Sequence, residues 1–171
     1  ITKKMKFNVN QQDLQQALSY CQGVIEKRST LPILSNVLMN VSNSNLIITA
    51  TDLDLIFINK IKSVEIVEEG TTTTSSSIMY DIVRKFSSGK KINLSLSETN
   101  KLQIESEKSN FNLNCLSPSE FPLTDENFND NEFSINSKSL LKLLNKCKFS
   151  VSNDETRHYL SGIYLHKTEV E

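Results

Sequence analysis

Apolar and polar positions alternate at the start of the chain and then change their period. Phe7 and Val9 alternate with polar neighbours over residues 6–10, which predicts a β-strand. Asn10 follows as a candidate helix cap, and apolar residues then recur at helical spacing. These apolar residues are Leu14, Ala17, Leu18, Cys21 and Ile25. The pattern predicts a helix that ends near residues 23–27.

Short alternating segments separated by polar turns follow this helix and predict a series of strands. The predicted strands cover residues 34–41, 46–50, 55–62, 64–67, 92–96, 102–105 and 111–116. Residues 55–62 and 64–67 could also form one long bent strand. The hydroxyl-rich residues 71–77 are interpreted as an exposed strand followed by a helix cap. A second helix is predicted from the spacing of Ile78, Ile82, Val83 and Phe86.

Runs of antiparallel strands with a single helix in each half of residues 6–116 indicate an α+β fold. We expect antiparallel sheets with two helices on one face, because such sheets commonly pack one face and leave the other wet. Prolines and an acidic cluster interrupt this pattern over residues 117–131, and we interpret 123–131 as a linker between domains.

A shift of 126 residues aligns the start of the chain with its end. The identical pairs are Phe7/Phe133, Asn10/Asn136, Leu14/Leu140, Leu18/Leu144, Cys21/Cys147, Thr30/Thr156, Leu34/Leu160 and Ser35/Ser161. They fall on the predicted strand and on the apolar face of the helix, as a repeated core requires. A chance match between two amphipathic segments is the alternative. We expect an extension or tag remnant at 1–4, a complete domain at 5–122, and the truncated start of a second at 132–171, within a longer protein.

The composition excludes several classes of protein. The 171 residues include 19 Lys and Arg and 20 Asp and Glu, which gives a net charge of −1. Proteins that hold nucleic acid by charge alone are usually basic, so the composition argues against that class. No apolar stretch approaches the roughly 18 residues of a membrane helix, and the first residues lack the apolar segment of a signal peptide. Three widely spaced cysteines are interpreted as reduced thiols, so a cytoplasmic location is expected.

Residues that could carry catalysis are sparse. Asp52 and Asp54 could form a metal-binding pair in a small metal-dependent enzyme, but a solvated loop is the stronger interpretation because no third ligand is evident. His158 and His166 are the two histidines, and their spacing fits no common metal motif. We find no nucleophile elbow, phosphate loop or dinucleotide turn. The sequence therefore predicts a binding or scaffold protein without cofactor, metal or enzymatic activity.

Several segments resemble the beta sliding clamp family of bacterial DNA polymerase III. These segments are RSTLPILSN from Arg28, TATDL from Thr49, SEFP from Ser119 and RHYLSG from Arg157, and the resemblance runs from Met5 to the end of the chain. The resemblance implies the DNA-clamp fold, with three similar domains in a subunit and two subunits closing into a homodimer ring around double-stranded DNA. It also implies a processivity factor in DNA replication, which has no catalytic site and tethers the polymerase catalytic subunit. A clamp loader complex is a further partner, and other polymerases and repair proteins bind through short linear motifs.

The resemblance places DNA contacts at Arg28, Asp154, His158 and Tyr159. Arg, His and Tyr side chains can contact phosphate or stack on bases. Asp154 and His158 depart from the residues that the family usually has there, and an Asp facing phosphate would repel it. A clamp-fold adaptor that binds peptides and engages DNA little is therefore the second hypothesis.

Two further pairs of residues receive roles from the resemblance. Arg157 and Leu160 match one edge of the cleft that holds partner peptides, and the rest of that cleft falls outside residues 1–171. Phe111 and Leu113 match an apolar contact between the two subunits of the ring.

Overall fold

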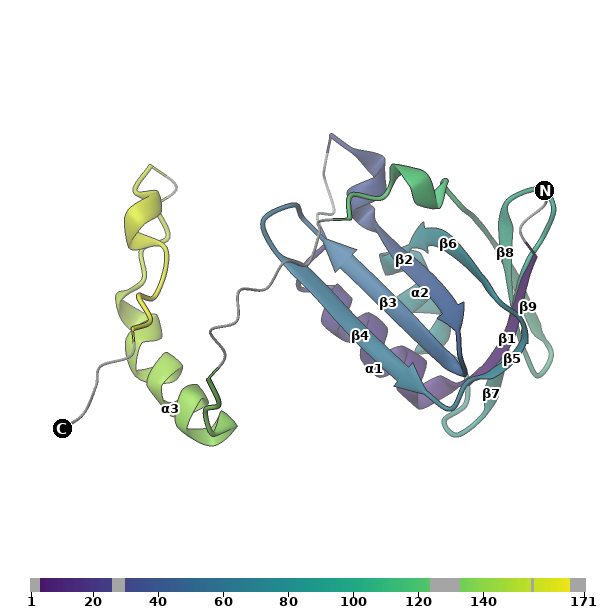
Figure 1. Cartoon of the computed structure of the whole chain (residues 1–171), viewed down its shortest axis with the longest axis horizontal. Coiled ribbons are helices and arrows are strands. Elements are labelled where there is room, and N and C mark those ends of the chain that lie inside the picture. The colour runs from purple at the N-terminus through teal and green to yellow at the C-terminus, as the bar shows by residue number, and fades with distance from the viewer. Residues whose placement is uncertain (1–3, 26–29, 124–132, 155, 167–171) are drawn as a thin grey trace. The chain divides into compact units, whose positions relative to one another are not determined.

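The computed structural model describes residues 4–25, 30–123, 133–154 and 156–166 (Figure 1). The chain divides into two compact units, Ile1–Thr124 and Asp125–Glu171. The predicted linker at 123–131 lies outside the described residues apart from Leu123. Within the described ranges, no helix has the length and apolar character needed to span a bilayer.

The first unit contains two antiparallel sheets, so the predicted α+β fold with antiparallel sheets is confirmed. Its strands are β1 (Met5–Asn10), β2 (Asn36–Ser42), β3 (Asn45–Thr51), β4 (Ile56–Lys62), β5 (Glu65–Glu68), β6 (Gly70–Ser75), β7 (Lys91–Leu96), β8 (Lys101–Ser106) and β9 (Ser109–Asn114). One sheet has the order β5-β1-β7-β8-β9 and the other the order β4-β3-β2-β6.

Residues 55–62 and 64–67 form two strands, β4 and β5, and not one bent strand. The two strands belong to different sheets. Ser63 between them has a φ of 60°, a left-handed conformation that interrupts an extended chain. The backbone at Ser63 therefore sends the chain from one sheet to the other, and the hydrophobic pattern alone does not predict this division.

The first helix follows the predicted pattern closely. Helix α1 covers Gln11–Cys21, and the Asn10 side chain accepts a hydrogen bond of 2.8 Å from the backbone N of Gln12. This contact satisfies one of the backbone donors that a helix leaves free at its N-terminus. The buried apolar positions of α1 are Leu14, Ala17, Leu18 and Cys21. The predicted cap and the predicted apolar face are both confirmed.

The second helix differs from the prediction in which side chains it buries. Helix α2 covers Ser76–Val83, and its buried apolar residues are Met79 and Val83, one helical turn apart. Ile78 is 53% exposed, so its assignment to the apolar face is wrong. The preceding hydroxyl-rich segment forms strand β6 as predicted, but it is not exposed. Its hydroxyls turn inward, and Thr73 Oγ1 donates to the carbonyl of Leu116 at 2.9 Å.

Both helices lie side by side on the same face of the four-stranded sheet (Figure 1). Helix α1 packs against β3 and β4, and α2 packs against β2 and β6. The apolar faces of both sheets and both helices form one continuous core. A smaller cluster beside it gathers around the 3-10 helix η1 (Pro32–Ser35), where Ile33 and Leu34 pack with Leu38 and Phe121.

The second unit repeats the start of the first in part. Its elements are helix α3 (Ser137–Cys147) and the 3-10 helices η3 (Lys148–Ser150) and η4 (His158–Leu160). The 3-10 helix η2 (Pro118–Glu120) belongs to the first unit. Helices α1 and α3 have 11 residues each and begin 126 positions apart, and Asn136 caps α3 as Asn10 caps α1. This agreement supports the internal repeat.

The repeat predicts a strand before α3, and the described residues of that segment do not form one. Residues 133–136 have no strand structure, whereas the equivalent strand β1 pairs with β5 and β7 on its two sides. The described residues of the second unit supply no such neighbour, and a single strand has no partner for its backbone hydrogen bonds. None of these residues is buried.

Candidate functional site

The loop of residues 152–160 is closed on itself by hydrogen bonds. The backbone N of Ser152 donates to the Leu160 carbonyl at 2.9 Å, and the backbone N of Asp154 donates to Ser152 Oγ at 3.1 Å. Asp154 Oδ1 accepts from the backbone N and the hydroxyl of Thr156, at 3.0 and 2.6 Å. These hydrogen bonds to the charged carboxylate hold the pKa of Asp154 below its usual value. Asp154 is therefore engaged in forming the loop.

Arg157 lies beside this carboxylate. Its Nε is 3.4 Å from Asp154 Oδ2, and both side chains are about half exposed. Exposed pairs of this kind contribute little to stability, because water screens them. The structure therefore brings together Asp154, which was expected at the DNA, and Arg157, which was expected at the peptide cleft. Their opposite charges partly cancel.

Two other predicted residues of this loop offer their side chains to solvent. Tyr159 is 82% exposed and Leu160 is 43% exposed, and both belong to η4. His158 begins η4, but its side chain is outside the described part of the chain. Arg28 also lies outside the described residues.

The predicted dimer contact falls on β9, which pairs only with β8 among the described strands. Phe111 is 40% exposed, and its ring centre lies 6.0 Å from that of Phe86. Leu113 is only 9% exposed and belongs to the core of the first unit. Of the two residues, Phe111 is the one with substantial free surface.

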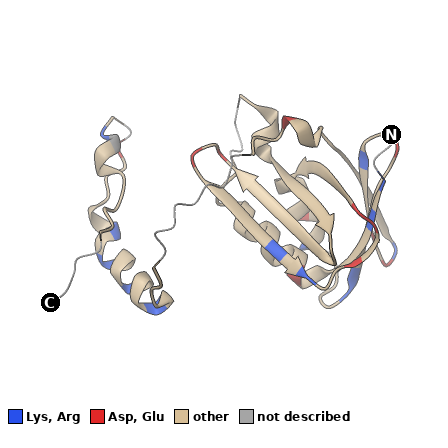
Figure 2. Cartoon of the chain, in the orientation of Figure 1, with Lys and Arg blue, Asp and Glu red and all other residues tan. Residues whose placement is uncertain are grey.

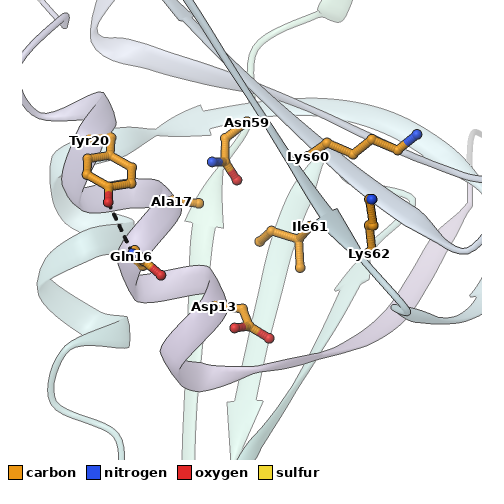
Figure 3. A pocket seen from close by; sticks show the side chains of 8 residues that line it. All are labelled: Asp13, Gln16, Ala17, Tyr20, Asn59, Lys60, Ile61 and Lys62. Carbon is orange, nitrogen blue, oxygen red and sulfur yellow. Dashed lines mark hydrogen bonds between the residues drawn. The ribbon is translucent and has the colours of Figure 1, made fainter. Parts of the chain in front are cut away.

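The predicted site residues include no position on the two grooves that flank α1. The groove between α1 and β4 has a volume of about 400 Å³ (Figure 3). It is lined by Asp13, Gln16, Ala17, Tyr20, Asn59, Lys60, Ile61 and Lys62. A second groove of about 720 Å³ has walls from α1 and from residues 80–88. The sequence feature that could have indicated these grooves is the set of glutamines at positions 11, 12, 15 and 16, which place polar side chains at helical spacing.

Glutamine amides join α1 to the second helix at both ends. Gln11 Nε2 donates to the carbonyl of Val83 at 2.9 Å, and Gln22 Nε2 donates to Ser76 Oγ at the same distance. Because Val83 ends α2 and Ser76 begins it, the two helices run antiparallel. Neither helix contains a Lys or an Arg. Apart from the exposed carboxylates of Asp13 and Asp81, the polar surface of this helix pair is therefore built from amides and hydroxyls.

The acidic pair considered for metal binding has another role. Asp52 Oδ1 accepts hydrogen bonds from the backbone N of Asp54 and of Leu55, at 3.1 and 2.7 Å. This carboxylate therefore shapes the turn before β4. In the part of the chain that the structure describes, no three His, Cys, Asp or Glu residues are grouped so that they could hold a metal ion.

Comparison with known proteins gives consistent results over nearly the whole chain. Residues 5–125 match the family described as DNA polymerase III beta subunit, N-terminal domain. The beta sliding clamp of Caulobacter vibrioides is 35% identical over 95% of this chain, and that of Escherichia coli K12 is 32% identical over 98%. The chain spans 44% and 45% of the length of these two relatives.

Solved structures show the same likeness in three dimensions. A crystal structure of the Caulobacter crescentus beta sliding clamp superposes with a TM-score of 0.93 at 33% identity, covering 99% of this chain and 45% of that one. A sliding clamp from Bartonella birtlesii gives a TM-score of 0.91 at 35% identity, covering 98% of this chain and 44% of that one. Together with the antiparallel α+β architecture, these matches show that the chain belongs to the family of the DNA polymerase III beta subunit.

Proposed function

We propose that the protein carrying this chain is a DNA sliding clamp, a ring dimer that encircles duplex DNA and tethers the replicative polymerase. The observation that carries the proposal is the likeness to beta sliding clamps along 95–99% of the chain, in sequence and in structure. The chain's near-neutral charge fits this function, because a ring retains DNA by enclosing it and needs few ionic contacts. The protein is a processivity factor without a catalytic site of its own.

The residues proposed to contact DNA are Arg28, Asp154, His158 and Tyr159. The exposed ring of Tyr159 supports this role, since a phenol can donate to phosphate or stack on a base. Asp154 contributes through the shape of its loop, because its carboxylate already accepts two hydrogen bonds from Thr156.

The peptide cleft and the dimer contact complete the proposal. Arg157 and Leu160 form one edge of a cleft for short motifs of the polymerase, the clamp loader complex and repair proteins. Phe111 contributes apolar surface to the dimer contact from an edge strand, and Leu113 supports that strand from the core. The peptide-binding adaptor without DNA engagement gains no support from the relatives, which are named beta sliding clamps.

Retention on DNA of different topology tests this function. The protein carrying this chain is assembled onto nicked circular DNA with its clamp loader, and half of the sample is then linearised by a restriction enzyme. We expect the protein to stay on the circle and to leave the linear DNA through its ends. Equal retention on both forms would refute the encircling mechanism.

A further inference from the structure

Asp154 is the single acidic residue among the described residues of the second unit. Four lysines and Arg157 lie in the same described residues, and the lysines of α3 appear in blue in Figure 2. Of these cations, the structure pairs Asp154 with Arg157. The carboxylate therefore acts on the Arg157 side chain and does not balance the charge of the helix.

The carboxylate of Asp154 is held in one orientation. Its Oδ1 accepts from the backbone N of Thr156 at 3.0 Å and from the Thr156 hydroxyl at 2.6 Å. Two hydrogen bonds to one oxygen restrain the rotation of the carboxylate, so Oδ2 stays in a fixed place. That oxygen lies 3.4 Å from Arg157 Nε. Asp154 therefore meets the guanidinium at its Nε edge.

The terminal donors of Arg157 remain available to a partner. A guanidinium carries five N–H donors in a planar fork, and Nε supplies one of them. Arg157 has no second acidic neighbour among the described residues of its unit, and its side chain is 60% exposed. The two terminal nitrogens can therefore be presented together, as the paired donors that bind a carboxylate or two carbonyl oxygens.

Arg157 and Leu160 lie on the same side of one turn. The backbone N of Leu160 donates to the Arg157 carbonyl at 2.8 Å, which closes a 3-10 turn. Side chains three positions apart eclipse each other in such a turn. Leu160 is 43% exposed, so the turn places apolar surface on the side of the guanidinium. A partner segment can therefore meet a fixed cation and an apolar side chain together.

The first unit shows that this turn does not need the ion pair. The shift of 126 residues places Leu31 at Arg157 and Leu34 at Leu160. The backbone N of Leu34 donates to the Leu31 carbonyl at 3.1 Å, so the same 3-10 turn forms with an uncharged residue at the position of Arg157. The formation of the turn therefore does not explain the ion pair of the second unit.

We propose that Asp154 is a positioning residue that holds Arg157 at the partner-peptide cleft and keeps its guanidinium away from the DNA. The proposal rests on the proposed function, which puts Arg157 at the cleft and its neighbours His158 and Tyr159 at the duplex. An unpaired Arg at this boundary can turn to either side, because a guanidinium binds phosphate as well as carboxylate. The fixed carboxylate removes that choice. Asp154 thus serves the peptide cleft, whereas the family resemblance alone assigns it to DNA.

Asp154→Asn tests the proposal because it removes the charge and keeps the shape of the side chain. The amide oxygen of Asn can still accept from Thr156, so the loop keeps its hydrogen bonds. Binding of the polymerase catalytic subunit to the whole protein is measured by surface plasmon resonance. Binding of a short linear duplex is measured by fluorescence anisotropy over a range of salt concentrations.

The two affinities should change in opposite directions. We expect Asp154→Asn to bind the polymerase about two- to five-fold more weakly, because Arg157 is no longer held at the cleft. The variant should bind the duplex more tightly, with a slope of log K against log salt that is steeper by about 0.9 for one added phosphate contact. Damage to the loop would weaken both interactions. Weaker binding of both partners would therefore overturn the proposal, as would unchanged binding of the polymerase.

Asp52→Asn is the matched control. Asp52 Oδ1 also accepts hydrogen bonds from two backbone N–H groups of its own turn. None of the ion pairs between described residues includes it. This variant loses the same charge from a similar turn, and we expect it to leave both affinities unchanged. A change equal to that of Asp154→Asn would show that net charge alone is responsible and would overturn the positioning role.

A double-mutant cycle separates failure of this proposal from failure of the proposed function. In a protein that already carries Arg157→Gln, Asp154→Asn should have no further effect on polymerase binding. An equal effect in both backgrounds would show that Asp154 acts without Arg157, which refutes the positioning role and leaves the cleft standing. If Arg157→Gln alone leaves polymerase binding unchanged, the cleft edge and the positioning role are both refuted. Retention on circular DNA then still decides the ring.

Discussion

Gly70 offers a sharp test of how the two sheets of the first unit meet. It begins β6 of the four-stranded sheet, where that strand passes β1 of the other sheet. A Cβ added at Gly70 would lie 2.9 Å from the Cβ of Met5 and 3.0 Å from the carbonyl oxygen of Lys4. The Met5 Cβ is bonded to the backbone of β1, and the Lys4 carbonyl belongs to the backbone just before it. Because Met5 is buried, neither atom can move away by a side-chain rotation. Gly70→Ala must therefore push the sheets apart at this point.

The expected cost follows from two opposing effects. Inserting a methyl group into a packed site typically costs about 1–3 kcal/mol. Replacing glycine by alanine also restricts the unfolded chain, which returns about 0.4–1 kcal/mol of stability. We expect the free energy of unfolding to fall by up to about 2.6 kcal/mol, with a central value of about 1.3 kcal/mol. For a typical m-value near 2 kcal/mol/M, the central value is a decrease of about 0.7 M in the urea midpoint.

Gly23→Ala is the matched control. The added Cβ would lie 3.6 Å from the carbonyl oxygen of Tyr20, an ordinary contact, and Gly23 does not have a positive φ. This variant should keep or raise the stability by about 0.4–1 kcal/mol. Urea unfolding followed by circular dichroism measures both. A Gly70→Ala midpoint at or above that of the unaltered protein would show that the two sheets do not meet as tightly as described.

Two further predictions concern ionisable groups. Burial raises the pKa of the Cys21 thiol to about 12, so its thiolate fraction at pH 8 is about 10⁻⁴. A thiol reagent should therefore label the exposed Cys147 in the native protein and label Cys21 only on unfolding. Equal labelling rates of Cys21 and Cys147 in the native protein would contradict this prediction. The Lys91 ammonium holds the pKa of Glu65 below its ordinary 4.5, so this pair stabilises the fold above that pH and loses its effect as the pH falls through the lowered pKa. The melting temperature of Lys91→Met should therefore differ from that of the unaltered protein near neutral pH and converge with it in acid, whereas a constant difference would exclude the pair as the cause.

The fold could be predicted where local signals and packing agree. Asn10 caps α1, and the apolar spacing that follows matches the face that the helix buries, because capping and periodicity act within a few residues. The prediction for α2 was wrong at Ile78 because the sheet, and not local periodicity, decides which face is covered. The division between β4 and β5 depends on the backbone at Ser63, which hydrophobicity does not encode.

The candidate site was predictable to a similar degree. Tyr159, which was drawn from the family resemblance, is exposed as a contact requires, whereas Leu113 is buried in the core. The engagement of Asp154 with Thr156 and Arg157 was not predicted, because a carboxylate can equally face solvent or its own turn.

The order of strands in the five-stranded sheet has a consequence for how the chain folds during synthesis. Strand β1 is made first, but its long partner β7 is 85 residues away, as the hydrogen bond between Asn8 and Asn93 illustrates. At synthesis rates of about 5–20 residues per second, β1 waits about 4–17 s for that partner. The strands β2, β3 and β4 follow one another as neighbours and can pair as they emerge. The β2-β3-β4 part of the four-stranded sheet is therefore expected to form first and to shelter the apolar side of α1 before β5 and β7 emerge to pair with β1.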